Sequence, residues 1–332
     1  MQHEHDARYG EAQSLERAGN IQAARALYAQ AAKSGHIGAL AGLAKNLLVR
    51  EPLDIPNGIG MLRGAADAGD GEAAALCAAL AGQDEALPGR WEVALDYLRR
   101  AAHGGFGPAR AQLGLLSQNG DWQGPVDLAR WLAPPAARTV FEAPHVMTLP
   151  GFASAALCDW LVETAKPRRT TAEIYDPRGG GQRRDDIRNN SAVSFDITQF
   201  DLILVLLRAR AAALMGVPVH DFEPPMVLHY AQGQQFAPHF DYIEPLTSSL
   251  VTDVAQHGQR VATFLLTLND GFEGGETAFP ELDWSFKGAK GDALLFWSAD
   301  AQGRLDRASL HAGAPVTSGE KWILSQWIRR PA

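Results

Sequence analysis

The chain has 332 residues, of which 46% are hydrophobic and 20% are charged, and its net charge is −8. This composition excludes a disordered chain and leaves room for two domains with separate cores, while the acidic balance argues against a general nucleic-acid binder. No apolar stretch approaches the roughly 20 residues that span a bilayer, and the first residues lack the apolar core of a signal peptide. We therefore expect a cytoplasmic protein with neither a membrane nor a nucleic-acid partner.

The two cysteines, Cys77 and Cys158, fall in apolar helical segments of different predicted domains. We expect no disulfide between them, because they are placed in separate folding units. Free thiols agree with a reducing cytoplasm.

A repeat organises the first 120 residues. An Ala-Ala pair begins at Ala31, Ala65 and Ala101, and small or apolar residues recur eight and twelve positions after each pair begins. A glycine follows each pair and is expected to end a helix, so each copy is predicted to be a helical hairpin. Such a period predicts an α-helical repeat solenoid over residues 1–120, followed by a linker or partial capping repeat over residues 121–144.

These copies resemble SEL-type repeats, which are related to TPR units and have longer, more variable loops. The resemblance implies a curved array that binds protein segments. The alternative is an Ala-rich helical bundle that only shields the second domain.

The remaining residues, 145–332, have a different pattern. Ser154 is predicted to cap a helix that runs to about Ala165, and Ile197–Met215 to form a longer helix. Strand-like runs separated by Gly-, Pro- and Asp-containing turns follow at Met226–Tyr230, Val261–Leu268, Ala293–Trp297 and Trp322–Ile328. Many short strands after one or two helices favour an antiparallel double-sheet barrel, that is, a double-stranded β-helix or jelly roll.

A candidate metal site lies in this second part. His239 and Asp241 are two residues apart on a predicted strand, so both side chains project from the same face. With His311 they supply the two imidazoles and one carboxylate that hold Fe(II) in non-haem oxygenases. A His-x-Asp tripeptide alone is weak support in a chain with ten histidines, and a surface histidine beside a turn aspartate is the alternative. Lys321 offers a positive charge for a dicarboxylate co-substrate.

An ordered series of motifs surrounds these residues. In chain order they are Pro150–Phe152, Arg188–Ser191, Tyr230–Tyr242, Arg260–Thr263, Leu268–Asp270, Gly274–Pro280, Lys290–Phe296, His311–Val316 and Gly319–Trp322. This series, over about residues 145–330, resembles the prolyl 4-hydroxylase-like 2-oxoglutarate oxygenases in order and spacing. An ordered set is far more specific than any single motif within it.

The resemblance implies that His239, Asp241 and His311 ligate Fe(II) and that Lys321 pairs with the distal carboxylate of 2-oxoglutarate. It further implies co-substrate contacts from Tyr230 and Thr277. Arg260 is a candidate contact to the distal carboxylate or to the substrate, and L-ascorbate is the implied reductant. The expected reaction hydroxylates a C–H bond and releases succinate and CO2, with a prolyl residue in a protein or peptide as the favoured substrate.

Some positions depart from the family pattern or stand outside it. Phe236 and Thr267 replace tyrosines of many members, which removes hydroxyl groups from the co-substrate network. Trp327 shares the strand face of Lys321 by its spacing, and core packing is its expected role. The segment 244–259 is longer than usual and is interpreted as a substrate-facing loop. The arginine- and glycine-rich segment 166–188 is either a solvated loop or a lid over a peptide.

Three alternative functions stay open. The enzyme could instead hydroxylate a free amino acid or small metabolite. The chain could be a repeat-based interaction scaffold with an inactive oxygenase domain, although all three ligands and Lys321 are retained. A Zn(II) hydrolase is the third alternative, but the chain has no HExxH motif and this function leaves Lys321 unexplained.

Overall fold

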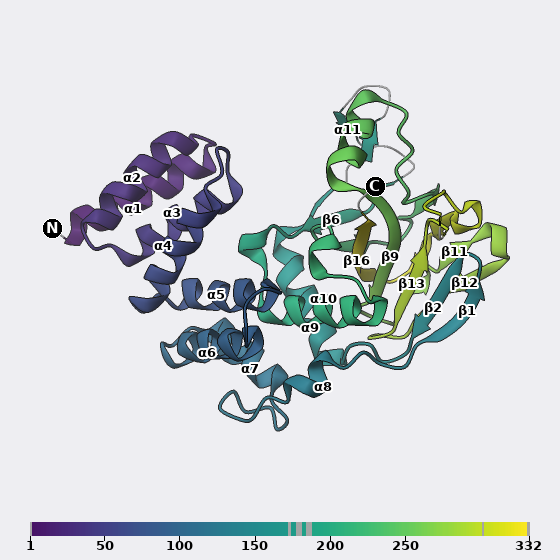
Figure 1. Cartoon of the computed structure of the whole chain (residues 1–332), viewed down its shortest axis with the longest axis horizontal. Helices are drawn as coiled ribbons and strands as arrows, with labels where there is room; N and C mark the ends of the chain where they lie inside the picture. The colour runs from purple at the N-terminus through teal and green to yellow at the C-terminus, as the bar shows by residue number, and fades with distance from the viewer. Residues whose placement is uncertain (1, 172–173, 177–180, 184–187, 301, 331–332) are drawn as a thin grey trace. The chain divides into compact units, whose positions relative to one another are not determined.

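The computed structural model describes residues 2–171, 174–176, 181–183, 188–300 and 302–330 (Figure 1). The chain divides into two compact units. The first comprises Met1–Leu132 with Asp196–Arg210, and the second comprises Ala133–Phe195 with Ala211–Ala332. The segment 196–210, which sequence analysis placed in the second domain, thus groups with the helical repeats.

Consecutive helices build the first unit, and each of the first six packs against the next along the chain. They are α1 (Gln2–Arg17), α2 (Ile21–Lys33), α3 (Ile37–Val49), α4 (Ile55–Asp67), α5 (Gly71–Gln83), α6 (Arg90–His103) and α7 (Gly107–Leu116), with the short α8 at Leu128–Leu132. Packing between chain neighbours is the arrangement expected of a repeat array.

The repeated positions of the sequence form the contacts between these helices. The first residues of the Ala-Ala pairs are at most 1% exposed, and the residues eight positions later are at most 2% exposed. After each pair, Gly35, Gly69 and Gly105 have φ values of +90°, +98° and +91°. This left-handed conformation is strained for residues with a Cβ atom. The helices and their glycine termini therefore agree with the repeat prediction.

The segment predicted as a linker or cap contains regular structure. Trp131 in α8 donates its indole N–H to the Leu116 carbonyl at the end of α7 (2.8 Å). Strand β1 (Arg138–Glu142) pairs antiparallel with β2 (His145–Leu149). The sheet of the second unit thus begins inside the residues that were assigned to the linker.

The two predicted helices after residue 150 have different outcomes. Helix α9 (Ala155–Ala165) is confirmed, and the Ser154 hydroxyl accepts from the Leu157 N–H as its cap. The helix predicted over Ile197–Met215 is confirmed from Leu202 to Met215, as α10, but its predicted start was wrong, because the chain first forms the separate short helix η2 (Ile197–Gln199). The Asp201 carboxylate accepts from the Leu204 N–H (2.8 Å) and starts α10 anew.

Two antiparallel sheets organise the second unit. The larger sheet has the order β1-β2-β13-β9-β16-β7-β6-β3. Its other strands are β3 (Thr170–Thr171), β6 (Ser191–Ser194), β7 (Met226–Tyr230), β9 (Gln259–Thr267), β13 (Ala293–Trp297) and β16 (Lys321–Arg330). The smaller sheet has the order β12-β11-β14-β8, with β8 (Phe236–His239), β11 (Thr277–Phe279), β12 (Trp284–Phe286) and β14 (His311–Gly313). The four predicted strand runs correspond to β7, β9, β13 and β16.

Smaller elements complete the unit. Two further sheets have two strands each: β10 (Glu273–Gly274) pairs with β15 (Val316–Ser318), and β4 (Ile174–Asp176) pairs with β5 (Gly181–Arg183). The remaining helices are η1 (Lys166–Arg168), η3 (Val219–Asp221), α11 (Ser248–His257), η4 (Pro280–Leu282) and η5 (Arg307–Ser309).

The core of the second unit lies between the sheets. Phe279 of β11 meets Phe296 of β13 edge to face, with ring centroids 5.1 Å apart, and both side chains are fully buried. Two facing antiparallel sheets confirm the predicted double-stranded β-helix. No helix among the described residues has the length and apolar content needed to cross a membrane.

Candidate functional site

The smaller sheet brings the three predicted metal ligands together. His239 at the end of β8 pairs in register with His311 at the start of β14, and Asp241 follows two residues after β8. One ligand atom from each residue lies within 4.8 Å of the others. The carboxylate oxygens of Asp241 lie 3.4 Å from His311 Nε2 and 3.8 Å from His239 Nε2. This spacing is suited to one metal ion.

Backbone carbonyls fix the tautomer of both imidazoles. His239 Nδ1 lies 2.8 Å from the Ala237 carbonyl, and His311 Nδ1 lies 3.0 Å from the Ser309 carbonyl. A carbonyl can only accept, so both Nδ1 atoms carry the proton and both Nε2 atoms present a lone pair to the site. Such a hydrogen bond on the far nitrogen is the usual support of a metal-bound histidine.

The protonation states of the triad also fit a metal ion. Burial, reinforced by the neighbouring His311, lowers the pKa of His239 to about 4, so this imidazole is neutral at pH 7. Burial alone would raise the pKa of Asp241, but the His311 and His239 imidazoles and a hydrogen bond from Thr263 lower it further than burial raises it. The Thr263 hydroxyl donates to Asp241 Oδ2 at 2.6 Å. Neutral imidazoles and an ionised carboxylate are the forms that bind metal.

A narrow cavity of about 40 Å³ adjoins the triad between the two sheets. Strands β7, β9 and β16 of the larger sheet form one side of it, and β8, β11 and β14 of the smaller sheet form the other. The triad and the three co-substrate residues Lys321, Tyr230 and Thr277 all line this cavity. The structure therefore brings together six of the seven predicted site residues.

Lys321 is a buried cation that faces this cavity. Its side chain is the first of β16, and the residue is 5% exposed. The ammonium group donates to the Gly275 carbonyl (2.6 Å) and makes no ion pair with any described residue. Burial lowers its pKa to about 8. A buried charge without a counterion is costly, so this position is suited to a carboxylate ligand.

Gly275 lets the chain pass close to Lys321. Its φ is +71°, and a Cβ atom there would lie 3.3 Å from the Lys321 side chain and 3.1 Å from the Phe272 ring. Both the conformation and the space favour glycine. The Gly-Gly-Glu motif of the sequence thus shapes the wall beside the lysine.

Tyr230 and Thr277 complete the cavity near Lys321. Tyr230 of β7 pairs in register with Lys321, and the lysine nitrogen lies 5.4 Å from its ring centroid. Burial raises the pKa of Tyr230 to about 12, so its hydroxyl remains a hydrogen-bond donor at pH 7. Thr277 is 7% exposed and reaches the cavity from β11. One anion could therefore contact side chains from both sheets.

Comparisons with known proteins agree with this arrangement. Residues 225–329 match the model of the 2OG-Fe(II) oxygenase superfamily. Prolyl 4-hydroxylase 1 of Arabidopsis thaliana is 33% identical over 204 residues, which cover 57% of this chain and 70% of the relative. The chain belongs to the prolyl 4-hydroxylase family of 2OG-Fe(II) oxygenases. It is accordingly a 2-oxoglutarate-dependent dioxygenase that uses Fe(II).

Two further proteins are similar. Probable prolyl 4-hydroxylase 3 of Arabidopsis thaliana is 30% identical over 264 residues, covering 74% of this chain and 82% of the relative. The solved structure of a viral collagen prolyl hydroxylase from Paramecium Bursaria Chlorella virus-1, as a 2OG complex, is 30% identical. That comparison covers 55% of this chain and 95% of the viral chain, with a TM-score of 0.43.

Arg260 is the predicted site residue of this oxygenase that does not reach the catalytic cavity. Its Nε and a terminal nitrogen donate to the Glu223 carboxylate at 2.6 and 2.9 Å. Its guanidinium group lies 3.6 Å from the ring centroid of Trp327. Trp327, expected to pack in the core, also borders the cavity. Arg260 therefore supports the wall of the cavity through this ring, and its charge is already paired.

Arg188 is a cavity residue of the oxygenase to which sequence analysis gave no role. It is 6% exposed, its Nε donates to the Asn190 side chain (2.9 Å), and its guanidinium lies 4.9 Å from the Phe236 ring. One terminal nitrogen is buried without a hydrogen-bond partner among the described residues. Arg188 can therefore donate to a ligand. Its place in the Arg188–Ser191 motif was the signal that could have found it.

The departures from the family pattern affect different parts of the site. Phe236 stacks on the His239 imidazole, with centroids 3.5 Å apart and planes at 15°, so its ring supports a predicted metal ligand. Thr267 does not line the catalytic cavity.

In the predicted lid, Arg169 lies 5.0 Å from the Trp322 ring centroid. Arg178, Arg184 and residues 179–180 lie outside the described residues, as does the side chain of Arg183.

Proposed function

We propose that this oxygenase hydroxylates a prolyl residue of a protein or peptide and that His239, Asp241 and His311 hold its Fe(II). The observation that carries the proposal is one cavity that combines the triad with a buried lysine lacking an ionic partner among the described residues. The relatives named prolyl 4-hydroxylases favour proline as the target. A free amino acid or small metabolite is the alternative substrate class.

The protein side chains have separate roles in this proposal. Bound Fe(II) and 2-oxoglutarate supply the dioxygen chemistry that hydroxylates a C–H bond and releases succinate and CO2. Lys321 binds the distal carboxylate of the co-substrate, and the Tyr230 hydroxyl donates to it. The unpartnered Arg188 nitrogen donates to a carbonyl of the substrate. The aromatic core around the triad, including Phe279 and Phe296, keeps water away from the reacting atoms.

Ascorbate dependence and a cytoplasmic location are also proposed. L-ascorbate would keep the iron reduced, as the family resemblance implies. Both cysteines are free and buried, and burial raises the pKa of the Cys77 and Cys158 thiols to about 12. Free thiols favour a reducing compartment.

Short proline peptides provide the test of the substrate class. We expect the enzyme, supplied with Fe(II), 2-oxoglutarate and ascorbate, to add one oxygen atom to a peptide with a central proline and to form succinate in equal amount. Mass spectrometry locates the added oxygen, and the same peptide with alanine in place of proline is the control. Oxygen addition to free amino acids, with all proline peptides unchanged, would replace the prolyl assignment by the metabolite alternative.

The helical repeats are proposed to recruit the protein that carries the target residue. A cavity of about 440 Å³ lies in the first unit, within the helices that run from α4 to α6. Apolar side chains of Ile59, Leu80, Leu87 and Val93 line it together with Arg63, Asp84 and Tyr97. An apolar cavity with a few polar groups is suited to part of a partner chain. Deleting residues 1–120 is a poor test of recruitment, because segment 196–210 belongs to the same compact unit and would lose the helices it groups with.

Point changes in this cavity test recruitment. We expect Ile59→Ser combined with Leu87→Ser to raise the KM for a full-length protein substrate by about tenfold, since two apolar contacts are lost. The kinetics with a short proline peptide should not change. The matched control is Leu53→Ser, which removes a 48% exposed leucine outside the cavity. Equal KM values for the protein substrate in all three enzymes would remove the recruitment role.

A further inference from the structure

A second and larger cavity adjoins the catalytic one. It measures about 650 Å³, against about 40 Å³ around the triad. Its lining comes from the residues that follow β8, from helix α11, and from Arg260 and Arg329. We call this cavity the α11 groove. Asp241 lines both cavities. The catalytic cavity is too small to hold a peptide, so the peptide residues that flank the reacting one must lie outside it. The α11 groove begins at Asp241 and is therefore in position to receive one of these flanking residues.

One wall of the α11 groove is apolar. Ile243, Leu246 and Leu250 line it, and Leu246 is 72% exposed, the highest value among the exposed large hydrophobic residues described. A single exposed leucine is ordinary. Here, however, three aliphatic side chains gather along one cavity that opens beside the catalytic carboxylate. This wall is suited to an apolar side chain of a bound peptide.

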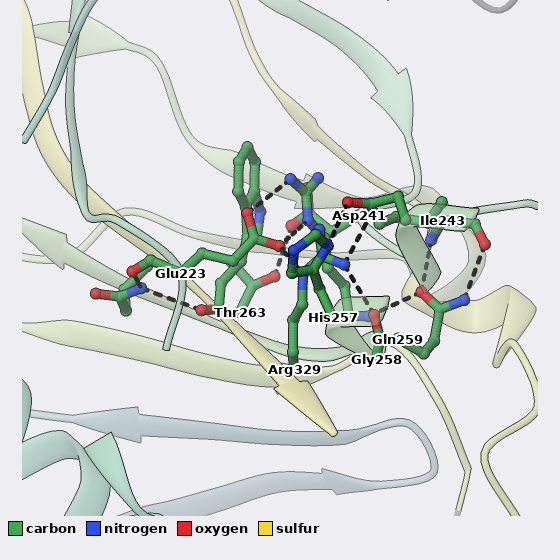
Figure 2. A network of polar contacts seen from close by, with 12 residues as sticks. Glu223, Asp241, Ile243, His257, Gly258, Gln259, Thr263 and Arg329 are labelled. Atoms are coloured by element: carbon green, nitrogen blue, oxygen red, sulfur yellow. Dashed lines mark hydrogen bonds and ion pairs between the residues drawn. The ribbon is translucent and has the colours of Figure 1, made fainter. Parts of the chain in front are cut away.

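The cationic groups on the other side of the groove are already paired. Glu223 accepts from Arg260, and also from Arg329 Nε at 2.6 Å. Arg329 further donates to Asp253 of α11 at 2.9 Å. It also donates to the Gly258 carbonyl at 2.8 Å (Figure 2). The groove therefore offers no free cation for an acidic ligand among its described lining residues. Glu244, by contrast, is exposed and makes no ion pair with a described residue.

The same contacts hold the groove in shape. Arg329 ties Asp253 of α11 to β16, and the Thr247 hydroxyl accepts from the Leu250 N–H as the cap of α11. The side-chain amide of Gln259 makes two hydrogen bonds, each 2.8 Å, to the backbone of Ile243 (Figure 2). The apolar wall is thus fixed to the strands of the barrel at two points, Asp253 and Ile243. A fixed wall can discriminate between side chains.

We propose that the α11 groove binds the residue of the peptide substrate that flanks the hydroxylated one, and that it selects an apolar side chain and rejects an acidic one. Leu246 supplies the main apolar contact, and Glu244 supplies the repulsion. This inference rests on the proposed action on a peptide. It adds a specificity determinant for residues next to the target.

The test uses the full-length enzyme and a set of short alanine-based peptides with a central proline. The residue on either side of the proline is varied among leucine, alanine, lysine and glutamate. We expect kcat/KM for the best leucine-flanked peptide to exceed that for its glutamate counterpart by about tenfold, mainly through KM. Leu246→Ser should remove most of this preference. Glu244→Gln should improve the glutamate-flanked peptide selectively.

Val251→Ser is the matched control. Val251 lies on α11, five residues after Leu246, and is 51% exposed, but it does not line the groove. This variant should keep the wild-type preference. Equal kcat/KM for leucine- and glutamate-flanked peptides, or an equal effect of the Leu246 and Val251 changes, would overturn the inference while leaving prolyl hydroxylation intact.

A binding measurement separates this inference from the proposed function. Fluorescence anisotropy of labelled peptides is measured with enzyme that holds Mn(II) and 2-oxoglutarate, so that no turnover is needed. One outcome is that no proline peptide gains oxygen, while leucine-flanked peptides bind about tenfold more tightly than glutamate-flanked ones and lose this advantage in Leu246→Ser. In that case the groove is a specificity site and the prolyl assignment is wrong. If no peptide binds with a flank preference, the groove is not a specificity site.

Discussion

Replacing His239 or Asp241 by alanine is expected to abolish iron binding and, with it, succinate formation. Each change removes one of three protein donors that lie within 4.8 Å of one another. The loss should exceed the roughly 10- to 100-fold effect of removing a group that only supports a ligand. The fold should persist, because His239 and Asp241 lie at and beyond the end of the short strand β8 and outside the hydrophobic core clusters.

Thr263→Val provides a graded comparison. Thr263 donates to Asp241 Oδ2 but is not itself a ligand, so its loss should weaken Fe(II) binding by about tenfold. His220→Ala is the control, since the His220 side chain is 77% exposed and does not line the catalytic cavity. Anaerobic Fe(II) titration measures the affinity, and circular dichroism checks the fold. Turnover close to the wild-type value in His239→Ala would refute the ligand assignment.

The spacing of the proposed ligands explains why the sequence predicted a metal site at the place where the structure brings the three side chains together. Two residues on one strand with a single residue between them must share a face, so the geometry of His239 and Asp241 is local. His311 is far away in the chain, and its pairing with β8 depends on the order of strands in the smaller sheet. Only the resemblance to a known family supplied that order before the structure.

The features missed by sequence analysis depend on contacts between distant segments. Glu223 pairs with Arg260 and Arg329, which lie 37 and 106 residues away. No local pattern predicts which carboxylate an arginine will find, so Arg260 was assigned to a ligand instead. The break before α10 has the opposite cause. It depends on the local cap at Asp201, which the apolar run that follows concealed.

Replacing Lys321 by methionine is expected to weaken 2-oxoglutarate binding by about 100-fold and to leave Fe(II) affinity within about threefold of wild type. Methionine keeps most of the side-chain volume and removes the charge, and a hydrogen-bonded buried ion pair that loses one partner is strongly destabilised. Lys287→Met is the control, because Lys287 is a partly exposed lysine that does not line the cavity. Titration of the iron-loaded enzyme with 2-oxoglutarate under anaerobic conditions gives both affinities.

The pH dependence tests whether the ammonium group itself binds the co-substrate. Burial lowers the pKa of Lys321 from 10.5 to about 8 in the free enzyme, so the charged form declines as the pH rises through 8. A bound carboxylate would raise this pKa again. Binding of 2-oxoglutarate between about pH 8 and pH 10 should therefore take up a proton and weaken steadily as the pH rises. Calorimetry in buffers of different ionisation enthalpy measures this proton uptake.

The same pKa shift predicts the effect of pH on stability. The folded chain releases the Lys321 proton near pH 8, while the unfolded chain keeps it to about pH 10.5. Since the unfolded state binds more protons in this window, the lysine's contribution to the free energy of unfolding rises with pH between these values. Bound 2-oxoglutarate should remove that trend, because it raises the pKa of Lys321 in the folded chain again, and Lys321→Met should show neither effect. If the mutant retains the proton uptake, or loses iron and 2-oxoglutarate affinity equally, the lysine is a structural residue and another group binds the carboxylate.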